Sequence, residues 1–188
     1  MLIRIAEYFS VRKRAHDLEI LHRLLAPEST FRLLDVGGGA GAATERFSRG
    51  CGEVTVLEPN RKKLAVGRKR RPAQRFQEGQ GESIPSPDEY FDRVVAVVAL
   101  HHSADQSQVL REMRRVLRAA GRIVLAELPP PRGPGLVARG IRRIGCHPQG
   151  SALSFLEPPE LKAKVEAAGF VDVAFHSGVT CYFVTATK

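Results

Sequence analysis

A glycine-rich turn, followed by a carboxylate at the end of the next apolar run, is the strongest chemical signal in this 188-residue chain. The run LLDVGGGAG, from Leu33 to Gly41, is typical of a buried strand that ends in a turn where backbone can approach a ligand without interference from a Cβ. In the following run, VTVLEPN, Glu58 can accept hydrogen bonds from both hydroxyls of a ribose. Together the two runs predict a site for an adenosine-bearing ligand.

Asp35 distinguishes between two kinds of adenosine-bearing ligand. The spacing Gly37-x-Gly39-x-x-Ala42 also satisfies a loose dinucleotide fingerprint. A carboxylate two residues before Gly37 would repel a pyrophosphate and attract a cation. S-adenosylmethionine carries an ammonium, a sulfonium and ribose hydroxyls but no phosphate, so the acidic flanks favour it. Alternatively, Asp35 only caps the backbone N–H groups of the turn.

Composition favours one globular domain. The chain is 43% hydrophobic and 26% charged, and its three cysteines lack the CxxC spacing of a zinc site or a disulfide framework. No apolar run approaches the ~20 residues that span a bilayer, and the N-terminus lacks the pattern of a signal peptide, so we expect a cytoplasmic protein. We expect a single domain over residues 1–188, with a helical cap over 1–28 and a Pro/Gly-rich, substrate-side loop over 129–150.

The net charge of +9 is unevenly distributed. Residues 61–75 hold eight basic side chains and no acidic one. This run could follow the phosphate backbone of RNA, but a solvated helix face is favoured because no aromatic residues interleave for base stacking. A second basic group, in the Pro/Gly-rich segment, could bind an anionic or phosphorylated substrate. It consists of Arg132, Arg139, Arg142 and Arg143.

Alternating apolar runs predict an α/β fold. We expect a Rossmann-like, doubly wound sheet of seven strands, mostly parallel with an antiparallel last strand, and helices on both faces. The run FDRVVAVVAL predicts a central strand beside the first strand. Ser177 and Gly178 predict a hairpin between the last two strands. The expected strands include 31–36, 53–58, 73–78, 91–98 and 121–127, and the expected helices include 42–49, 60–70 and 104–119.

Five motifs in this order resemble the class I S-adenosylmethionine-dependent methyltransferases, in particular the small-molecule branch of the ubiquinone and menaquinone biosynthesis methyltransferases. LLDVGGGAG resembles the cofactor loop of the family, and VTVLEPN resembles its ribose-binding strand end. GQGESIPSPDEYFDRVVAVVALHH resembles the adenine-contacting turn and fourth strand. REMRRVLRAAGRIVLAEL resembles the fifth strand with its preceding helix, and LKAKVEAAGF the last helix. The resemblance covers the chain from about Phe31 to Lys188.

The resemblance implies that S-adenosyl-L-methionine is the cofactor. The implied binding residues are Asp35, Gly37, Gly39, Gly41, Glu58, Pro59, Gln80, Gly81 and Ala99. Gln80 stands where the family commonly has an Asp that meets the adenine amino group, and Gly81 could offer its N–H to the ring. Glu82 either shares this role or is a structural acid. The usual Pro-Gly-Gly before the fifth strand is Ala119-Ala120-Gly121 here.

Two histidines follow the predicted fourth strand, at the edge where open parallel sheets bind ligands. We predict that His101 takes a proton from a substrate hydroxyl or amine. In the alternative interpretation, one histidine caps the helix that begins near Ala104 and the other packs in the core. A metal site from His101, His102 and Asp105 lacks further ligands at usable spacing, so no metal is expected.

These observations predict a methyltransferase that moves a methyl group from S-adenosylmethionine to a small-molecule acceptor by in-line displacement. We expect the N-terminal helix to close over the cofactor through Tyr8 and Phe9. One alternative is an RNA methyltransferase that uses the basic run 61–75. The other is a non-catalytic, cofactor-binding partner subunit. The acceptor and the oligomeric state, a dimer being one option, stay open at this point.

Overall fold

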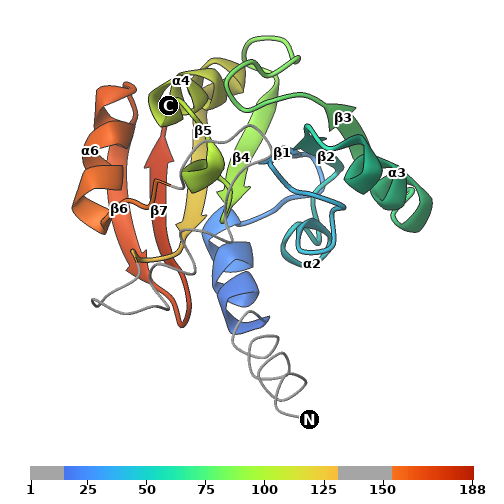
Figure 1. The fold of residues 1–188 in the computed structure, drawn as a ribbon, viewed down its shortest axis with the longest axis horizontal. Coiled ribbons are helices and arrows are strands. Elements are labelled where there is room, and N and C mark those ends of the chain that lie inside the picture. Colours follow the sequence, from blue (N-terminus) through green and yellow to red (C-terminus); the bar gives the residue numbers. More distant parts are fainter. Residues whose placement is uncertain (1–14, 131–153) are drawn as a thin grey trace.

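The computed structural model describes residues 15–130 and 154–188, and these form one seven-stranded sheet in the order β3-β2-β1-β4-β5-β7-β6 (Figure 1). Strand β7 pairs antiparallel with β5 and β6, and the pairs among β1 to β5 are parallel. The predicted sheet is therefore confirmed, including the place of β4 beside β1. The strands are β1 (Arg32–Val36), β2 (Glu53–Glu58), β3 (Arg75–Glu78), β4 (Phe91–Val97), β5 (Leu117–Glu127), β6 (Val171–Ser177) and β7 (Tyr182–Thr187).

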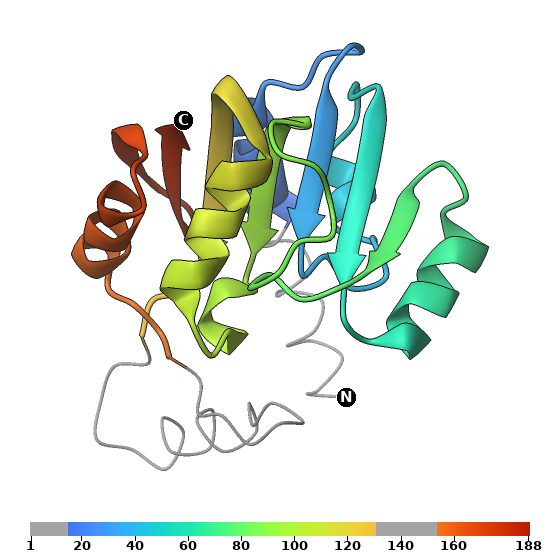
Figure 2. The same cartoon turned by 90° about the horizontal axis from the view of Figure 1, so that it is seen from above.

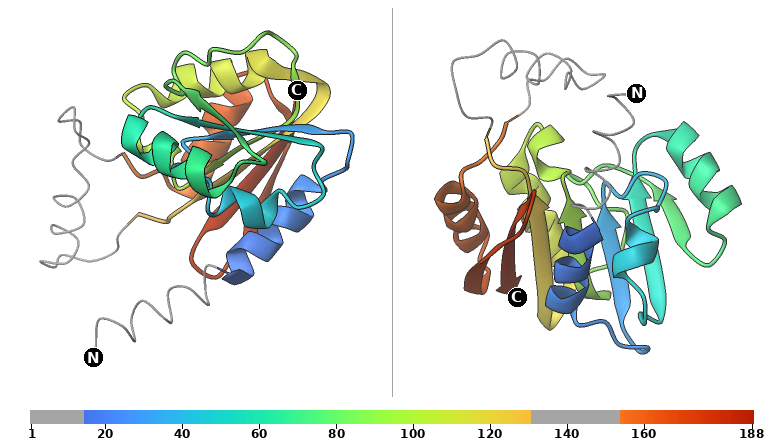
Figure 3. Two further views of the ribbon diagram at one scale, coloured as in Figure 1. Left: turned by 90° about the vertical axis from the view of Figure 1, so that its right-hand side faces the viewer. Right: turned by 90° about the horizontal axis from the view of Figure 1, so that it is seen from below.

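Helices cover both faces of the sheet, as predicted. Figures 2 and 3 show α4 (Gln106–Val116) and α6 (Pro158–Ala167) on one face, and the helix over residues 15–25 with α2 (Thr44–Phe47) on the other. None of the helices within the described ranges is long and apolar enough to cross a bilayer. The remaining helices of these ranges are α3 (Arg61–Arg70) and the 3-10 turn η1 (Leu100–His102).

Each face of the sheet has its own buried apolar cluster. On one face, Leu21 and Leu25 of the helix over 15–25 pack with β-strand residues such as Val95. On the other, Leu110 of α4 and Leu161 of α6 pack in a second cluster. All five side chains are at most 1% exposed, and burying each contributes about 1.5–3 kcal/mol. Because both faces are covered, the parallel strands read as nearly continuous apolar runs.

Several element boundaries differ from the prediction, most clearly those of α2, α4 and β5. The helix expected over 42–49 is only the four-residue α2, because a turn flanks it on each side. The turn that follows the glycines continues through residue 43, and the turn after α2 ends at Gly50, whose φ is +92°. The helix expected over 104–119 ends at Val116, and β5 begins at Leu117 instead of residue 121. The start of β5 is irregular, since its register to β4 shifts between Phe91 and Arg93.

Candidate functional site

The glycine loop lies at the carboxyl ends of β1 and β2 and is bonded to β2. The N–H groups of Gly37 and Gly38 donate to the Leu57 carbonyl at 2.8 and 3.3 Å. The N–H of Gly39 donates to Oε2 of Glu58 at 3.1 Å. The predicted loop and the predicted ribose-binding carboxylate are therefore neighbours in the structure.

The loop also lies against two other predicted parts of the site. A Cβ added at Gly37, whose φ is +78°, would come within 2.8 Å of the Ala99 Cβ beyond β4. A Cβ added at Gly81 would come within 3.2 Å of Val36, the last residue of β1. The ends of β1, β2 and β4 and the turn after β3 thus meet at one edge of the sheet, where doubly wound sheets bind ligands.

Asp35 is buried beneath the glycine loop, with 1% of its surface exposed. Its Oδ2 accepts the Thr44 hydroxyl at 2.5 Å, and its Oδ1 has no partner among the described residues. Burial raises the pKa of Asp35 from 3.8 to about 7; the Thr44 hydrogen bond opposes this shift and the nearby charge of Glu58 adds to it. A buried carboxylate oxygen without a donor fits a ligand that is cationic or donates hydrogen bonds.

Glu58 uses both carboxylate oxygens to hold the loop and the start of α3. Its Oε1 accepts the Asn60 N–H at 3.0 Å, and the Lys63 ammonium lies 3.6 Å from the same oxygen. The side chain is 5% exposed. Each carboxylate oxygen has two lone pairs, so acceptor capacity remains for ribose hydroxyls. Pro59, the next predicted contact, is exposed.

Two residues that the sequence did not identify hold the loop from outside. Arg71 donates from Nη1 to the Ala40 carbonyl at 3.1 Å and pairs with Glu45 at 3.0 Å. Gln74 donates to the Gly41 carbonyl at 3.4 Å, and its buried Oε1 has no partner among the described residues. A Cβ added at Gly41, whose φ is +76°, would collide with Gln74. The connection from α3 to β3 therefore fixes the loop.

Arg71 and Gln74 belong to the basic run 61–75, whose charges are partly neutralised within the fold. Four of its eight basic side chains have acidic partners in the structure. The pairs are Arg61–Glu78, Lys63–Glu58, Arg71–Glu45 and Arg75–Glu53. Within α3 only Leu64 and Gly67 are buried. This arrangement favours the solvated helix face over a track for RNA.

The turn after β3 contains the predicted adenine contacts. The Gln80 carbonyl accepts the Ser83 N–H at 3.2 Å, and Gln80 is exposed. Glu82 accepts the Ala104 N–H at 3.2 Å, so its carboxylate links this turn to the residues before α4. This bond favours the structural interpretation of Glu82. The roles of Gln80 and Gly81 in binding adenine stay predictions.

His101 is buried at the end of β4 and is bonded to a carboxylate. Its Nδ1 lies 2.6 Å from Oε2 of Glu127, the last residue of β5, and both side chains are 5% exposed. The interpretation of a histidine as the cap of the next helix is wrong, because α4 begins at Gln106 and Asp105 is its N-cap. Glu127 was not identified from the sequence, where the only signal is a carboxylate ending the apolar run RIVLAE.

A strained residue directs the chain from β4 to His101. Val98 has φ +52°, which is unusual for a β-branched residue, and its N–H donates to the Ala126 carbonyl at 2.7 Å. Backbone strain of this kind costs about 1–3 kcal/mol and often occurs at functional sites. The chain after Val98 forms η1, which carries His101.

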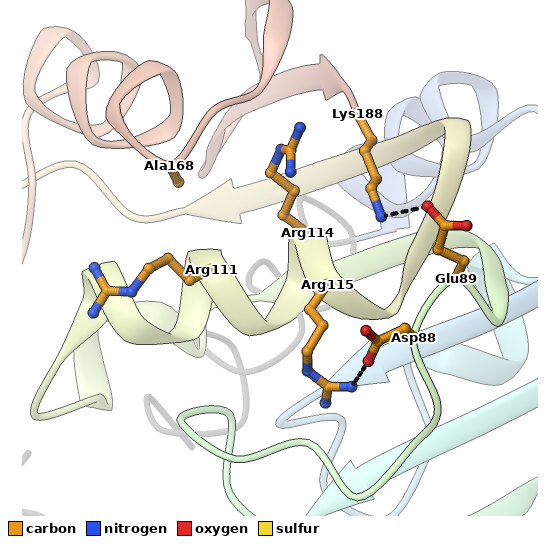
Figure 4. A pocket seen from close by; sticks show the side chains of 7 residues that line it. All are labelled: Asp88, Glu89, Arg111, Arg114, Arg115, Ala168 and Lys188. Atoms are coloured by element: carbon orange, nitrogen blue, oxygen red, sulfur yellow. Dashed lines mark hydrogen bonds and ion pairs between the residues drawn. The ribbon is translucent and has the colours of Figure 1, made fainter.

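The pocket of Figure 4 lies away from these residues, at the amino ends of the parallel strands. Its cations largely neutralise its own acids, since Arg115 pairs with Asp88 and Lys188 with Glu89. Residues 15–130 and 154–188 contain no group of three or more His, Cys, Asp or Glu side chains that could hold a metal ion. Tyr8, Phe9, Arg132, Arg139, Arg142 and Arg143 lie outside the described residues.

Comparisons with known proteins agree with this geometry. Residues 34–125 match a family described as a methyltransferase domain. The ubiquinone/menaquinone biosynthesis C-methyltransferase UbiE of Hahella chejuensis is 36% identical over 111 residues, which are 54% of this chain and 45% of that protein. The chain spans about half the length of the curated relatives it matches.

Solved structures extend the likeness to the whole fold. YcgJ of Bacillus subtilis has 27% sequence identity and a TM-score of 0.69, over 86% of this chain and 69% of that protein. An S-adenosylmethionine-dependent methyltransferase of Thermotoga maritima has 20% identity and a TM-score of 0.75, over 100% of this chain and 96% of that one. At this low identity the second likeness concerns the fold alone.

Proposed function

The chain belongs to the class I S-adenosylmethionine-dependent methyltransferases, and on this premise we propose that it moves the cofactor's methyl group to a small-molecule acceptor. The observation that carries the proposal is the pair of buried carboxylates, Asp35 and Glu58, on the two sides of the glycine loop. The carboxylate of Asp35 would repel a pyrophosphate. The pair complements an ammonium, a sulfonium and two ribose hydroxyls.

The chain's own residues have distinct roles in this proposal. S-adenosylmethionine supplies an activated methyl group when bound. Asp35 faces the cationic methionine end, and Glu58 accepts the ribose hydroxyls. Gly37 and Gly39 let backbone approach the ligand, and the turn at Gln80 binds the adenine ring.

Transfer then depends mainly on positioning. An in-line displacement requires the acceptor to be aligned with the S–CH₃ bond and shielded from water, and proximity of this kind can lower a barrier by roughly 7–11 kcal/mol. His101 accepts the acceptor's proton. We propose that residues 1–28 and 129–150 provide the surfaces that recognise the acceptor, an anionic compound if the arginines of the second segment contact it. The domain assignment over 1–188 and a cytoplasmic location are parts of the same proposal.

A binding experiment tests the cofactor. Isothermal titration calorimetry with S-adenosylmethionine should give saturable heat, and the same titration with NAD should give none, because Asp35 disfavours a pyrophosphate. Absence of heat with S-adenosylmethionine at millimolar concentration would overturn the proposal. RNA binding that weakens steeply with added salt would support an RNA methyltransferase instead.

A labelling experiment tests the transfer. The protein is incubated with methyl-labelled S-adenosylmethionine and a pooled metabolite extract, and the labelled products are separated and identified. We expect label in a small molecule. Cofactor binding without any labelled product would instead support a non-catalytic partner subunit.

A further inference from the structure

We propose that Glu127 positions His101 so that Nε2 accepts a proton, and that the methyl acceptor is accordingly a weakly acidic hydroxyl compound, of the phenol or enol class. The inference rests on the proposed methyl transfer. It deepens that function by naming a positioning residue and the class of the nucleophile. The observation behind it is the hydrogen bond between the His101 ring and the buried Glu127 carboxylate.

The hydrogen bond determines which ring nitrogen is free. An ionised carboxylate only accepts hydrogen bonds, so Nδ1, at 2.6 Å from Glu127, carries the ring proton. The lone pair of the neutral imidazole is then on Nε2. Within the described ranges, Nε2 has no hydrogen-bond partner. A hydrogen bond from an imidazole to a carboxylate strengthens when the imidazole gains a proton.

Glu127 cannot rotate freely, because its second oxygen is also bonded. Oε1 accepts the Leu100 N–H at 2.8 Å, so the carboxylate bridges the backbone of η1 and the ring of His101. Strands β4 and β5 pair in parallel at Val97 and Ala126, which places the residues that follow them side by side. The dyad is thus fixed by the sheet itself.

Aromatic rings and backbone hold the imidazole from other sides. The Phe155 ring stacks on it with centroids 4.7 Å apart and an interplanar angle of 16°. The His102 ring lies 4.3 Å away, and the Ser154 N–H donates to the His101 carbonyl at 3.0 Å. Tyr182 is the register partner of Glu127 on β7. Burial and the nearby charge of Glu127 raise the pKa of Tyr182. The hydrogen bond to Glu127 and the contacts with the Phe155 and His102 rings therefore hold the imidazole.

The dyad lies next to the cofactor loop. Ala99, two residues before His101, is the residue that meets Gly37, and the His102 N–H donates to the Ala99 carbonyl at 3.1 Å. A base at this place can serve the acceptor at the reacting end of the site. Both side chains are nearly excluded from water, where a fixed dipole or charge acts more strongly than in solution.

The chemistry of the base selects the class of acceptor. An imidazole whose Nδ1–H is held by Glu127 can take the proton of a weakly acidic, phenol-like hydroxyl at Nε2. The acceptor O–H bond breaks and its proton goes to Nε2. The oxygen lone pair forms the O–CH₃ bond, and the electrons of the S–CH₃ bond remain on sulfur as a thioether. A neutral amine already has an available lone pair and needs no base for its attack.

Glu127→Gln separates positioning from packing, because it keeps the shape and inverts the tautomer. The Leu100 N–H needs an acceptor, so the amide oxygen takes the place of Oε1 and the amide NH₂ faces Nδ1. Nδ1 then accepts, and the ring proton moves to Nε2. We expect ¹⁵N NMR of histidine-labelled protein to show the Nδ1–H tautomer for His101 in the wild type and the Nε2–H tautomer in the variant. This measurement needs no acceptor.

The same variant should lower the rate of labelled-product formation at least about a hundredfold, with the calorimetric Kd for S-adenosylmethionine unchanged within about twofold. A His101→Gln, Glu127→Gln double variant should be no slower than the slower single variant, since the two residues act as a unit. Glu112→Gln is the matched control, because Glu112 also bridges a backbone N–H, of Ile84, and a side chain, of Arg115. It should leave the rate unchanged.

The outcomes are distinguishable. An unchanged tautomer in Glu127→Gln, or an unchanged rate, would overturn the positioning role. A labelled product methylated on nitrogen would overturn the proposed class of acceptor. If the wild type binds the cofactor and labels nothing, the proposed transfer fails, whereas the NMR result still decides whether Glu127 sets the tautomer of His101.

Discussion

The carboxyl edge of the sheet has two halves that are built in different ways. In the glycine-loop half, the main bonds join residues close in sequence, as between Asp35 and Thr44 or between Gly39 and Glu58. In the His101 half, the main bonds join residues further apart, as between His101 and Glu127 or between Gln106 and Ser154. A short sequence motif determines the geometry of the glycine-loop half, whereas the geometry of the His101 half depends on which strands are neighbours in the sheet.

This difference explains where sequence analysis succeeded. The loop requires glycine at positions with positive φ and a carboxylate after the next strand, and both signals can be read within about 25 residues. The order and direction of the strands followed from the same alternation of apolar runs. Most of the fold and half of the candidate site were therefore predictable.

The largest expected effect tests the local half. In Glu58→Gln, the amide must place its NH₂ against a backbone N–H, because Gly39 and Asn60 donate to the two different carboxylate oxygens. The variant also loses the negative charge that accepts the ribose hydroxyls. Charge-assisted hydrogen bonds contribute about 1.5–3 kcal/mol, so we expect binding of S-adenosylmethionine to weaken roughly a hundredfold by calorimetry.

Glu78→Gln is the control for that variant. Glu78 is the register partner of Glu58 on β3 and is exposed, so the substitution makes the same change of charge on the next strand without touching the loop. The affinity of the Glu78→Gln variant for the cofactor should equal that of the wild type. Equal losses in both variants would mean that general electrostatics, and not the bridging carboxylate, governs binding.

A second prediction concerns the pH dependence of the buried acid. With a pKa of about 7 in the folded state and 3.8 as its reference value, Asp35 keeps its proton on folding between about pH 4 and 7. Its contribution to the free energy of unfolding therefore falls as the pH rises through this window. Above pH 7 the ionised, buried carboxylate destabilises the folded state to its full extent. Asp35→Asn should remove this decline, which denaturant unfolding between pH 4 and 8 measures.

The ionised form of Asp35 attracts the cationic ligand, so affinity should change in the opposite direction. We expect wild-type binding of S-adenosylmethionine to tighten about fivefold from pH 6 to 7.5, with release of a proton below pH 7. Asp35→Asn should show a flat profile over the same range. A wild-type profile without slope would contradict the assignment of the pKa to this residue.

The residues that sequence analysis missed share one physical property. Glu127, Arg71 and Gln74 act through contacts with segments far along the chain, and nothing in their own neighbourhood distinguishes them. Glu127 is meaningful only because β4 and β5 pair, and Arg71 because α3 ends beside the loop. Conversely, Glu82 was placed correctly in the turn but its bond to Ala104 appears only once α4 is in position.

Arg71 tests the comparison of the two halves, because it lies far along the chain from the glycine loop and nevertheless holds that loop. In Arg71→Ala the Ala40 carbonyl and the Glu45 carboxylate lose their donor, and the loop is held from one side only. We expect cofactor affinity to fall about threefold, with Arg75→Ala, which breaks only the surface pair with Glu53, as the control. A loss as large as that of Glu58→Gln would show that the loop does not hold its own geometry.

The smallest expected effect tests whether a change in stability alone alters cofactor affinity or the tautomer of His101. Ala120 is exposed and has φ +58°, a left-handed conformation that favours glycine, at the place where related enzymes commonly carry a Pro-Gly-Gly turn. Ala120→Gly should therefore raise the free energy of unfolding by about 1 kcal/mol, or Tm by about 2–4 °C, measured by thermal denaturation. The neighbouring Ala119→Gly, also exposed but without positive φ, should lower it. Because residue 120 is at the end of β5 remote from Glu127, neither variant should change cofactor affinity or the tautomer of His101. A change in the affinity or in the tautomer would mean that the two halves of the edge respond to the stability of the sheet and not only to their own hydrogen bonds.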